Sequence, residues 1–263
     1  MEPRFLSIVV PAYNEEQRLP ASLRKLQEFA AAQPYTVELV LSDDGSTDGT
    51  RPLLDSFAAD LAGSGDPEAL SVRIVGDRVN RGKGSAVRAG MLAAAGAQVL
   101  FTDADLSTPL EDVELLLAEV KRGADVAIGS RGLRESHLEV REPWYRELLG
   151  RCGNLVIQVV AVPGIHDTQC GFKLFTRAAS QAIFGRSVMD GISFDVEILY
   201  LARRMGLRVS EVPIHWAYDR RTRIKLARDS YRMLRDLVLL RHRHRGLSPK
   251  AVLAVQDSRP PIR

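Results

Sequence analysis

The sequence is poor in cysteine and has no long apolar segment. Cys152 and Cys170 are the only cysteines in 263 residues, which is too few for a disulfide framework or a zinc cluster and favours two buried thiols in a reducing compartment. The longest apolar stretch, residues 155–165, contains Gln158 and a Pro-Gly break and is shorter than the roughly 20 residues that span a bilayer. The N-terminus lacks the basic and apolar regions of a signal peptide. We therefore expect a cytoplasmic protein that does not cross a membrane by itself.

Two common nucleotide-binding motifs are also missing. No G-x-G-x-x-G follows the first strand-like segment and no G-x-x-x-x-G-K-[ST] occurs, so neither the usual dinucleotide site nor a P-loop is supported. The net charge is only +3, but residues 219–245 hold ten Lys or Arg against three Asp or Glu. Positive charge gathered near one end of an otherwise balanced chain gives no reason to expect a nucleic-acid partner.

Short runs rich in Val, Ile and Leu alternate with segments of helical spacing. The runs, each ending in a turn-forming or polar residue, cover residues 5–11, 37–43, 71–77, 97–103 and 124–130. The helical segments cover residues 18–32, 50–62, 84–96 and 108–123, the last with Thr108 as N-cap and Pro109 at the first helical position. This alternation predicts an α/β fold with a mostly parallel sheet and helices on both faces. Ligands bind at the carboxyl ends of strands in such sheets, so the chemistry is expected there.

The remainder of the chain is less regular. It predicts helices over 142–162, 193–206 and 223–243, and strands over 171–175 and 207–216. We expect one domain over residues 1–218, a basic amphipathic helix within 219–247, and a flexible tail over 248–263.

Two aspartates follow the fourth strand-like run with no lysine or arginine among the next ten residues. They are Asp103 and Asp105, separated by Ala104. Residues i and i+2 of an extended stretch point the same way, so both carboxylates can face one pocket. Mg²⁺ and Mn²⁺ prefer carboxylate oxygens and often bridge them to substrate phosphates. The pair therefore predicts a divalent metal site.

Several motifs in one order resemble a known family. The order VVPAYNEE, SDDGSTDGT, NRGKGSAVRAG, TDADLSTP and GSR is similar to that of family 2 glycosyltransferases, which have the nucleotide-sugar-binding GT-A fold. The later run IHDTQCGFKLFTRAA, followed by FDVEILYLARRMG, resembles the dolichyl-phosphate β-glucosyltransferases, of which the dolichyl-phosphate mannosyltransferases are close relatives. The resemblance implies an inverting transfer of a hexose, with glucose from UDP-glucose favoured, onto a polyprenyl phosphate. A GDP-mannose donor, a soluble alcohol acceptor, and a binding scaffold without catalysis are the alternatives.

The resemblance assigns the nucleotide-sugar donor to the strand ends. Pro11, Ala12 and Tyr13 would line the base pocket, and Glu15 would face the ribose. The full donor-binding set is Pro11, Ala12, Tyr13, Glu15, Asp43, Asp44, Lys83, Asp103, Ala104 and Asp105. Asp43 or Asp44 would accept hydrogen bonds from the base. Asp103 would touch the ribose or the sugar and Asp105 would bind the metal, with Asp103 as the other candidate metal ligand. In the alternative interpretation, DDGSTDG is only a turn that caps the next helix through Ser46 or Thr47, and NRGKG is an ordinary helix start.

The resemblance places the acceptor beside DTQCGFK. Asp167, Gln169 and Lys173 would line the donor sugar and the acceptor phosphate. The arginines that would hold the acceptor phosphate are Arg131, Arg146, Arg221 and Arg223. A phosphate is already ionised near neutral pH, whereas an alcohol would need a base, for which Asp167 or Asp195 are candidates. Asp195 and Glu197 would hold sugar hydroxyls or position the preceding loop, or they only complement the dipole of the helix that they begin. Ser107 stands where the mannosyltransferases usually carry glutamine, which leaves the third metal ligand open.

The terminal helix has one apolar face. Its apolar positions and one serine recur at helical spacing, at Leu226, Ser230, Met233, Leu234, Leu237 and Leu240. A basic amphipathic helix can lie on anionic lipid, or it can pack on the protein core with a solvated basic face. A lipid-phosphate acceptor favours the first interpretation, a peripheral protein at the inner face of a membrane. The oligomeric state is open.

Overall fold

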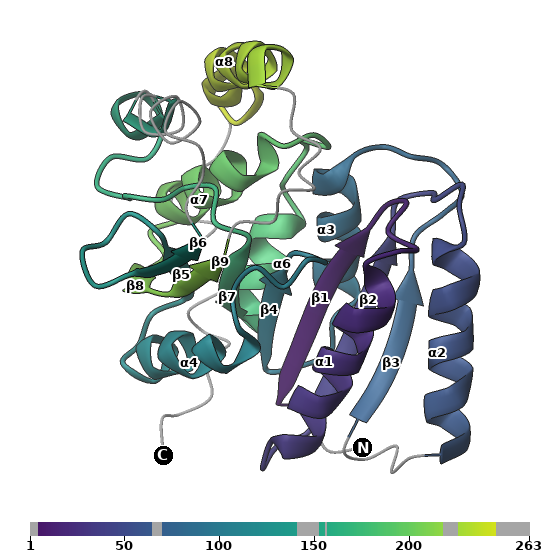
Figure 1. Cartoon of the computed structure of the whole chain (residues 1–263). Coiled ribbons are helices and arrows are strands. Elements are labelled where there is room, and N and C mark those ends of the chain that lie inside the picture. Colours follow the sequence, from purple (N-terminus) through teal and green to yellow (C-terminus); the bar gives the residue numbers. More distant parts are fainter. Residues whose placement is uncertain (1–4, 65–69, 141–152, 156, 218–225, 246–263) are drawn as a thin grey trace.

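The computed structural model describes residues 5–64, 70–140, 153–155, 157–217 and 226–245. Its centre is a seven-stranded sheet (Figure 1). In sheet order the strands are β3 (Leu70–Val75), β2 (Val37–Asp43), β1 (Leu6–Ala12), β4 (Gln98–Thr102), β7 (Phe172–Thr176), β5 (Val126–Ser130) and β8 (Val209–Pro213). Strand β7 is antiparallel to both of its neighbours, and the other pairs are parallel. The predicted mostly parallel sheet is confirmed.

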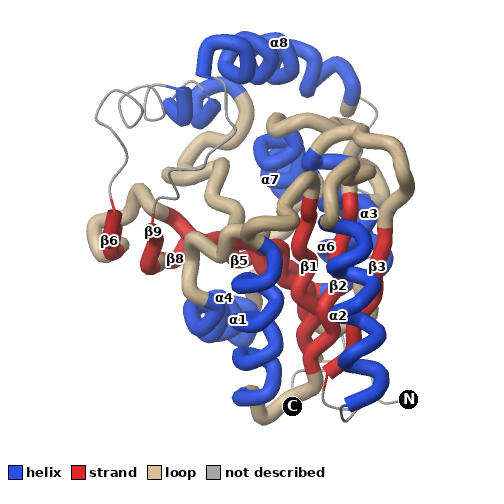
Figure 2. The backbone as a smooth tube through the Cα atoms, turned by 45° about the vertical axis from the view of Figure 1, so that its right-hand side comes forward, coloured by secondary structure: helices blue, strands red, loops and turns tan. Residues whose placement is uncertain are grey.

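Helices cover both faces of this sheet (Figures 1 and 2). One face carries α1 (Leu19–Ala32), α2 (Thr50–Ser64) and α4 (Val113–Lys121). The other face carries α3 (Lys83–Ala93), α6 (Arg177–Phe184) and α7 (Phe194–Arg204). A last helix, α8 (Leu226–Arg243), lies across the top of the molecule in both views. The α/β prediction with two covered faces is therefore confirmed.

The strand sequences explain why both faces need cover. In β1, Leu6, Ile8 and Val10 belong to the core under α1 and α4, whereas Val9 belongs to the core under α3 and α7. All four side chains are fully buried. Side chains alternate between the faces of a strand, so an unbroken apolar run requires an apolar partner on each side.

Two local predictions are wrong. The strand expected over residues 207–216 is divided between β8 and β9 (His215–Ala217), and β9 pairs with β6 (His137–Val140) in a separate two-stranded sheet. Buried Ile214 lies between β8 and β9. Thr108 is not an N-cap, because Pro109 has extended backbone angles (φ −56°, ψ 139°) and a 3₁₀ turn, Leu110–Asp112, precedes α4. The start signals at Thr108 and Pro109 therefore place the beginning of the helix several residues too early.

The terminal helix packs against the protein. Leu237 and Leu240 are buried in the same core cluster as α7, while Val238 on the other side of the helix is 76% exposed. The described part of the apolar face is therefore covered by protein, which is the core-packing alternative. In the described residues no helix combines the length and the apolar character needed to cross a bilayer. The division into residues 1–218, 219–247 and 248–263 stays a prediction, and the expected tail lies outside the described residues.

Candidate active site

The loops that follow β1 and β2 are joined by hydrogen bonds. The backbone N–H of Asn14 donates to Ser46 Oγ (2.9 Å), and that of Glu15 donates to Thr50 Oγ1 (2.7 Å). The backbone N–H of Thr47 donates in return to Asn14 Oδ1 (2.8 Å). The predicted base pocket therefore consists of two segments that lie side by side, with Tyr13 37% exposed at its surface.

Asp43 and Asp44 both accept hydrogen bonds from backbone N–H groups of the surrounding loops. Asp43 Oδ1 accepts the backbone N–H of Ser46 (3.1 Å), which is the turn geometry of the alternative interpretation. Asp44 accepts the N–H groups of Arg81 (3.0 Å) and Gly82 (2.9 Å), and so fixes the loop that leads into α3. Burial raises the pKa of Asp44 and outweighs these two hydrogen bonds. The predicted contact of either carboxylate with a base stays a prediction.

Lys83, at the start of α3, reaches Asp103 at the end of β4. Lys83 Nζ lies 2.6 Å from Asp103 Oδ1 and 5.4 Å from the centre of the Phe101 ring. Burial opposes the charge on Lys83, but Asp103, Asp195 and Asp105 outweigh it and raise the lysine pKa. The sequence prediction that the NRGKG segment lies at the site is consistent with this placement, because the structure brings Lys83 and both aspartates together.

Gly171 leaves the space that the Asp103 carboxylate occupies. A Cβ atom at position 171 would lie 2.1 Å from Asp103 Oδ2, so any side chain there would displace the carboxylate. The backbone N–H of Asp103 also donates to the Gly171 carbonyl (3.2 Å). The glycine of DTQCGFK is therefore required by the position of Asp103, and this ties the donor motif to the later one.

Asp105 is held in a tight turn. Its Oδ1 accepts the backbone N–H of Ser107 (3.0 Å), and Leu106 between them has a positive φ of 47°. The Ala104 carbonyl accepts a hydrogen bond from Ser22 Oγ of α1 (2.6 Å), a residue that the sequence analysis missed. Buried Ser22 is fixed by a tertiary contact across 82 positions of the chain, and nothing local in the sequence signals it.

The two aspartates fit a divalent cation. Burial, followed by the charge of Asp103, raises the pKa of Asp105. A cation between two carboxylates relieves this unfavourable charge. No group of three or more His, Cys, Asp or Glu side chains that could cage a metal is found among the described residues. Mg²⁺ is usually bound through one or two carboxylates plus substrate phosphates.

Lys173 and Asp195 form a buried ion pair beneath these residues. Lys173 is fully buried, and its Nζ lies 2.5 Å from Asp195 Oδ1 and 2.5 Å from the Cys170 carbonyl. Burial raises the pKa of Asp195, although Lys173 and Lys83 oppose this. Burial also raises the pKa of the Cys170 thiol to about 12, as expected of an inert core cysteine. Lys173 supports the site from below, and its direct contact with ligands stays a prediction.

Arg131 and Asp167, which the sequence analysis assigns to the acceptor, form an ion pair with three hydrogen bonds. The backbone N–H, Nε and Nη2 of Arg131 all donate to the Asp167 carboxylate, at 3.0, 2.7 and 3.0 Å. Burial would raise the pKa of Asp167, but the charge and hydrogen bonds of Arg131 outweigh burial and hold it at about 2. The guanidinium carbon lies 5.2 Å from the centre of the Trp216 ring, a contact that the sequence analysis missed.

Three contacts join α8 to the loops around the site. Gln169 Nε2 lies 3.8 Å from Met233 Sδ, and Ser193 Oγ donates to Asp236 (2.8 Å). His244, just past the end of α8, lies 2.8 Å from the fully buried Glu197. Glu197 also accepts backbone N–H groups of residues 188 and 189, so it positions a loop. Arg146, Arg221 and Arg223 lie outside the described residues.

Comparison with known proteins identifies the class. Residues 7–184 match the model of glycosyl transferase family 2, and the chain belongs to this family. The structure is similar to glucosyl-3-phosphoglycerate synthase from Mycobacterium tuberculosis in complex with UDP, with a TM-score of 0.63 at 21% identity over 91% of this chain and 80% of that one. A complex of that synthase with Mn²⁺, UDP and glucosyl-3-phosphoglycerate has a TM-score of 0.63 at 20% identity, over 90% and 80% of the two chains. These likenesses show the GT-A fold.

Sequence relatives narrow the group. Dolichyl-phosphate β-glucosyltransferases match this chain at 34% identity in Dictyostelium discoideum and at 40% in Drosophila melanogaster. The first alignment covers 91% of this chain and 75% of the relative, and the second covers 80% and 66%. The Saccharomyces cerevisiae protein of the same name is 36% identical over 91% of this chain and 75% of its own length. The chain is a glycosyltransferase, and the resemblance seen in its motifs is confirmed.

Proposed function

We propose that this glycosyltransferase moves glucose from UDP-glucose onto a polyprenyl phosphate, with inversion at the anomeric carbon. The names of its relatives support the donor and the acceptor. The structural observation that carries the proposal is that Asp167 and Asp195, the two candidate bases, are both held in ion pairs. Asp167, bound by Arg131, has a pKa of about 2 and is a poor proton acceptor near neutral pH. Asp195 is tied to Lys173. An acceptor that is already ionised needs neither as a base.

The proposed reaction is a single displacement. An oxygen of the acceptor phosphate forms a bond to the anomeric carbon while the bond to the UDP oxygen breaks, and UDP leaves with the electron pair. Arg131 holds the acceptor phosphate, because a guanidinium presents paired donors that match phosphate oxygens. Asp167 fixes the direction of that guanidinium through its hydrogen bonds. Attack from the side opposite the leaving group gives a β-linked product from an α-linked donor.

Asp103 and Asp105 would hold Mg²⁺ or Mn²⁺. Asp105 is the stronger candidate of the two ligands. The bound cation supplies positive charge that stabilises the departing diphosphate. Lys83, which now pairs with Asp103, is placed to add a second positive charge to the same region. The hydrogen bond from Ser22 to the Ala104 carbonyl holds the turn that carries both aspartates.

A membrane surface is the proposed meeting place with the acceptor. Since Leu237 and Leu240 of α8 are buried, the proposed lipid contact falls to the outer face of the helix, where Arg235, Arg243 and Val238 are exposed. The cytoplasmic leaflet carries anionic lipids, and each basic residue near it contributes about 1 kcal/mol. We therefore propose peripheral attachment at the cytoplasmic side. Flotation with anionic vesicles at low and high salt tests this, and absence of binding at both would contradict it.

The donor is tested by offering the purified chain UDP-glucose and GDP-mannose separately, with Mg²⁺ or Mn²⁺ and a polyprenyl phosphate. Labelled glucose in the organic phase, dependent on the metal, is the expected result. Transfer from GDP-mannose alone would overturn the donor but keep the acceptor. Binding of UDP without any lipid product would contradict the acceptor and point to a soluble one.

A further inference from the structure

Glu197, in the first turn of α7, is a fully buried carboxylate that three other residues contact. It accepts the backbone N–H of Val188 with both oxygens (3.0 and 3.1 Å) and that of Met189 with Oε2 (2.9 Å). Its Oε1 also lies 2.8 Å from His244 Nε2. A buried carboxylate is costly unless hydrogen-bond donors surround it, so these residues are held together at one point. The proposed reaction uses neither Glu197 nor His244.

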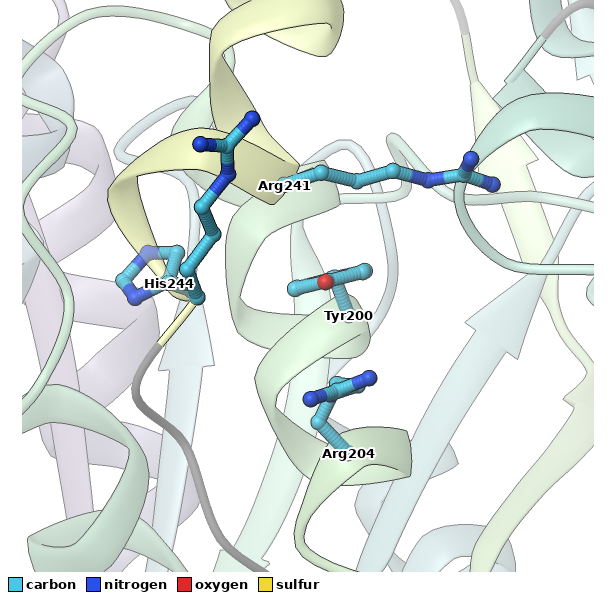
Figure 3. Close-up of a pocket in the computed structure, with 5 residues that line it drawn as sticks. Tyr200, Arg204, Arg241 and His244 are labelled. Atoms are coloured by element: carbon cyan, nitrogen blue, oxygen red, sulfur yellow. The ribbon is translucent and has the colours of Figure 1, made fainter.

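His244 carries the position of α8 to Glu197. Its backbone N–H donates to the Leu240 carbonyl (3.2 Å), so the ring follows the last turn of the helix. Figure 3 shows the ring beside the end of α8, near the part of α7 that carries Tyr200, and the centres of the two rings are 6.3 Å apart. His244 and Leu240 are both buried. A shift of α8 on α7 would therefore move the His244 ring against the Glu197 carboxylate.

The loop that Glu197 holds also packs on the start of α3. The Asp190 carbonyl accepts the backbone N–H of Gly84 (2.7 Å). A Cβ atom on Gly82 would lie 2.5 Å from the same carbonyl oxygen. The two backbones are thus in contact on either side of Lys83, and close packing leaves little room for one to move without the other. The loop therefore sets where the Lys83 side chain begins.

Lys83 connects this contact to the candidate active site. Its Nζ lies 2.6 Å from Asp103 Oδ1. The same Nζ lies 5.9 Å from the centre of the Phe194 ring, and Phe194 is the first residue of α7. The start of α7 and the loop before it thus face Lys83 together. A series of printed contacts leads from α8 through His244 and Glu197 to the lysine of the donor side.

We propose that Glu197 is a positioning residue for Lys83, and that His244 makes its effect depend on how α8 is seated. Coupling between two sites is reciprocal, so a well-seated α8 should favour binding of the nucleoside diphosphate, and the bound nucleotide should favour the seating of α8. The proposal rests on the proposed function for the role of Lys83 at the diphosphate. The link from His244 to Gly84 rests only on the contacts between them.

The test compares four forms of the full chain. They are wild type, Glu197→Gln, His244→Ala and the matched control His242→Ala, which removes the same side chain from an exposed position of α8. Buried Leu237 and Leu240 still hold α8 when the His244 ring is removed, so His244→Ala should fold even if Glu197→Gln does not.

Two quantities are measured on each form. Amide hydrogen exchange of Gly84 is followed by NMR without substrate, relative to the amide of Leu39 in the core of β2, so that a general loss of stability cancels. The Kd for UDP is measured by calorimetry at saturating Mn²⁺. A merely structural role of Glu197 and His244 would change neither quantity.

We expect exchange of Gly84 to quicken about tenfold in His244→Ala and in Glu197→Gln, and the Kd for UDP to rise several-fold, as for the loss of a hydrogen bond to a charged group. His242→Ala should match wild type in both. Unchanged exchange in His244→Ala, or an equal change in His242→Ala, would overturn the link. Faster exchange with an unchanged Kd would overturn the effect on the donor site. Absence of any lipid product from wild type would contradict the proposed function alone, because the exchange measurement needs no transfer.

Discussion

The two halves of the sheet are built in different ways. On the donor side, β1, β2 and β4 end in acidic loops, and the loops after β1 and β2 hydrogen-bond to one another, as Asn14 does with Ser46 and Thr47. On the acceptor side, Arg131 is held by Asp167 and faces Trp216, and these residues come from three distant segments. The proposed donor half is built from short motifs at the strand ends, while the proposed acceptor half brings Arg131, Asp167 and Trp216 together from distant segments. Substitutions in the two halves should therefore fail in different steps.

The largest expected effect comes from Asp105→Asn on the donor side. Loss of one ligand charge should lower transfer about 10²–10³-fold, the range for removing one electrostatic stabiliser of a transition state. Steady-state transfer measured over a range of Mn²⁺ concentrations checks this, with Asp55→Asn on α2 as an exposed control. Activity of Asp105→Asn within twofold of wild type would remove Asp105 from the metal site.

Replacing Lys173, the buried partner of Asp195, should lower the stability of the fold. Lys173→Met leaves the Asp195 carboxylate buried without its partner, which should lower the free energy of unfolding by about 3 kcal/mol. The double variant Lys173→Met, Asp195→Asn should recover part of this loss, since no unpaired charge remains. Urea denaturation of wild type, Lys173→Met, Asp195→Asn and the double variant gives the coupling. A single variant as stable as wild type would show that the pair is not needed for folding.

Arg131→Lys should impair the acceptor half and leave the donor half unchanged. The charge remains but the paired geometry is lost, so the KM for polyprenyl phosphate should rise about tenfold while the Kd for UDP stays unchanged. Arg134→Lys, an exposed neighbour, is the matched control. An equal rise of both constants would mean that Arg131 does not act on the acceptor alone.

The pH dependence of stability tests the Arg131–Asp167 pair. The folded pKa of Asp167 is about 2, below its ordinary value of 3.8, so the Arg131–Asp167 interaction stabilises fully above about pH 4. Its contribution of about 2 kcal/mol should be lost as the pH falls toward 2. Unfolding of wild type and Asp167→Asn should converge over this range. A constant difference down to pH 2 would contradict the depressed pKa.

The smallest effect should come from Ser22→Ala. The buried Ala104 carbonyl loses its donor, which should cost about 1 kcal/mol of stability and raise the Mn²⁺ concentration needed for half-maximal transfer a few-fold. Ser56→Ala on the exposed side of α2 serves as the control. A loss of stability with an unchanged metal requirement would limit Ser22 to a structural role.

The same contrast explains what the sequence could predict. The parallel strands, the covered sheet and the closeness of Lys83 to Asp103 follow from apolar runs and from motifs at strand ends, which depend on local sequence. The break at Ile214, the role of Ser22 and the Trp216 contact depend on pairing across long distances, so no local pattern signals them. Pro109 misled the helix boundary because its fixed φ suits both a helix and an extended turn.

The acceptor chemistry is the central claim, and it is tested most directly by offering the same lipid chain as a phosphate and as an alcohol. With UDP-glucose and Mn²⁺ present, the account predicts transfer to polyprenyl phosphate and none to the matched polyprenol, because Asp167 and Asp195, the two candidate bases, are both held in ion pairs. Transfer to the polyprenol at a comparable rate would contradict the account, since it would require a proton acceptor that the proposed mechanism does not use.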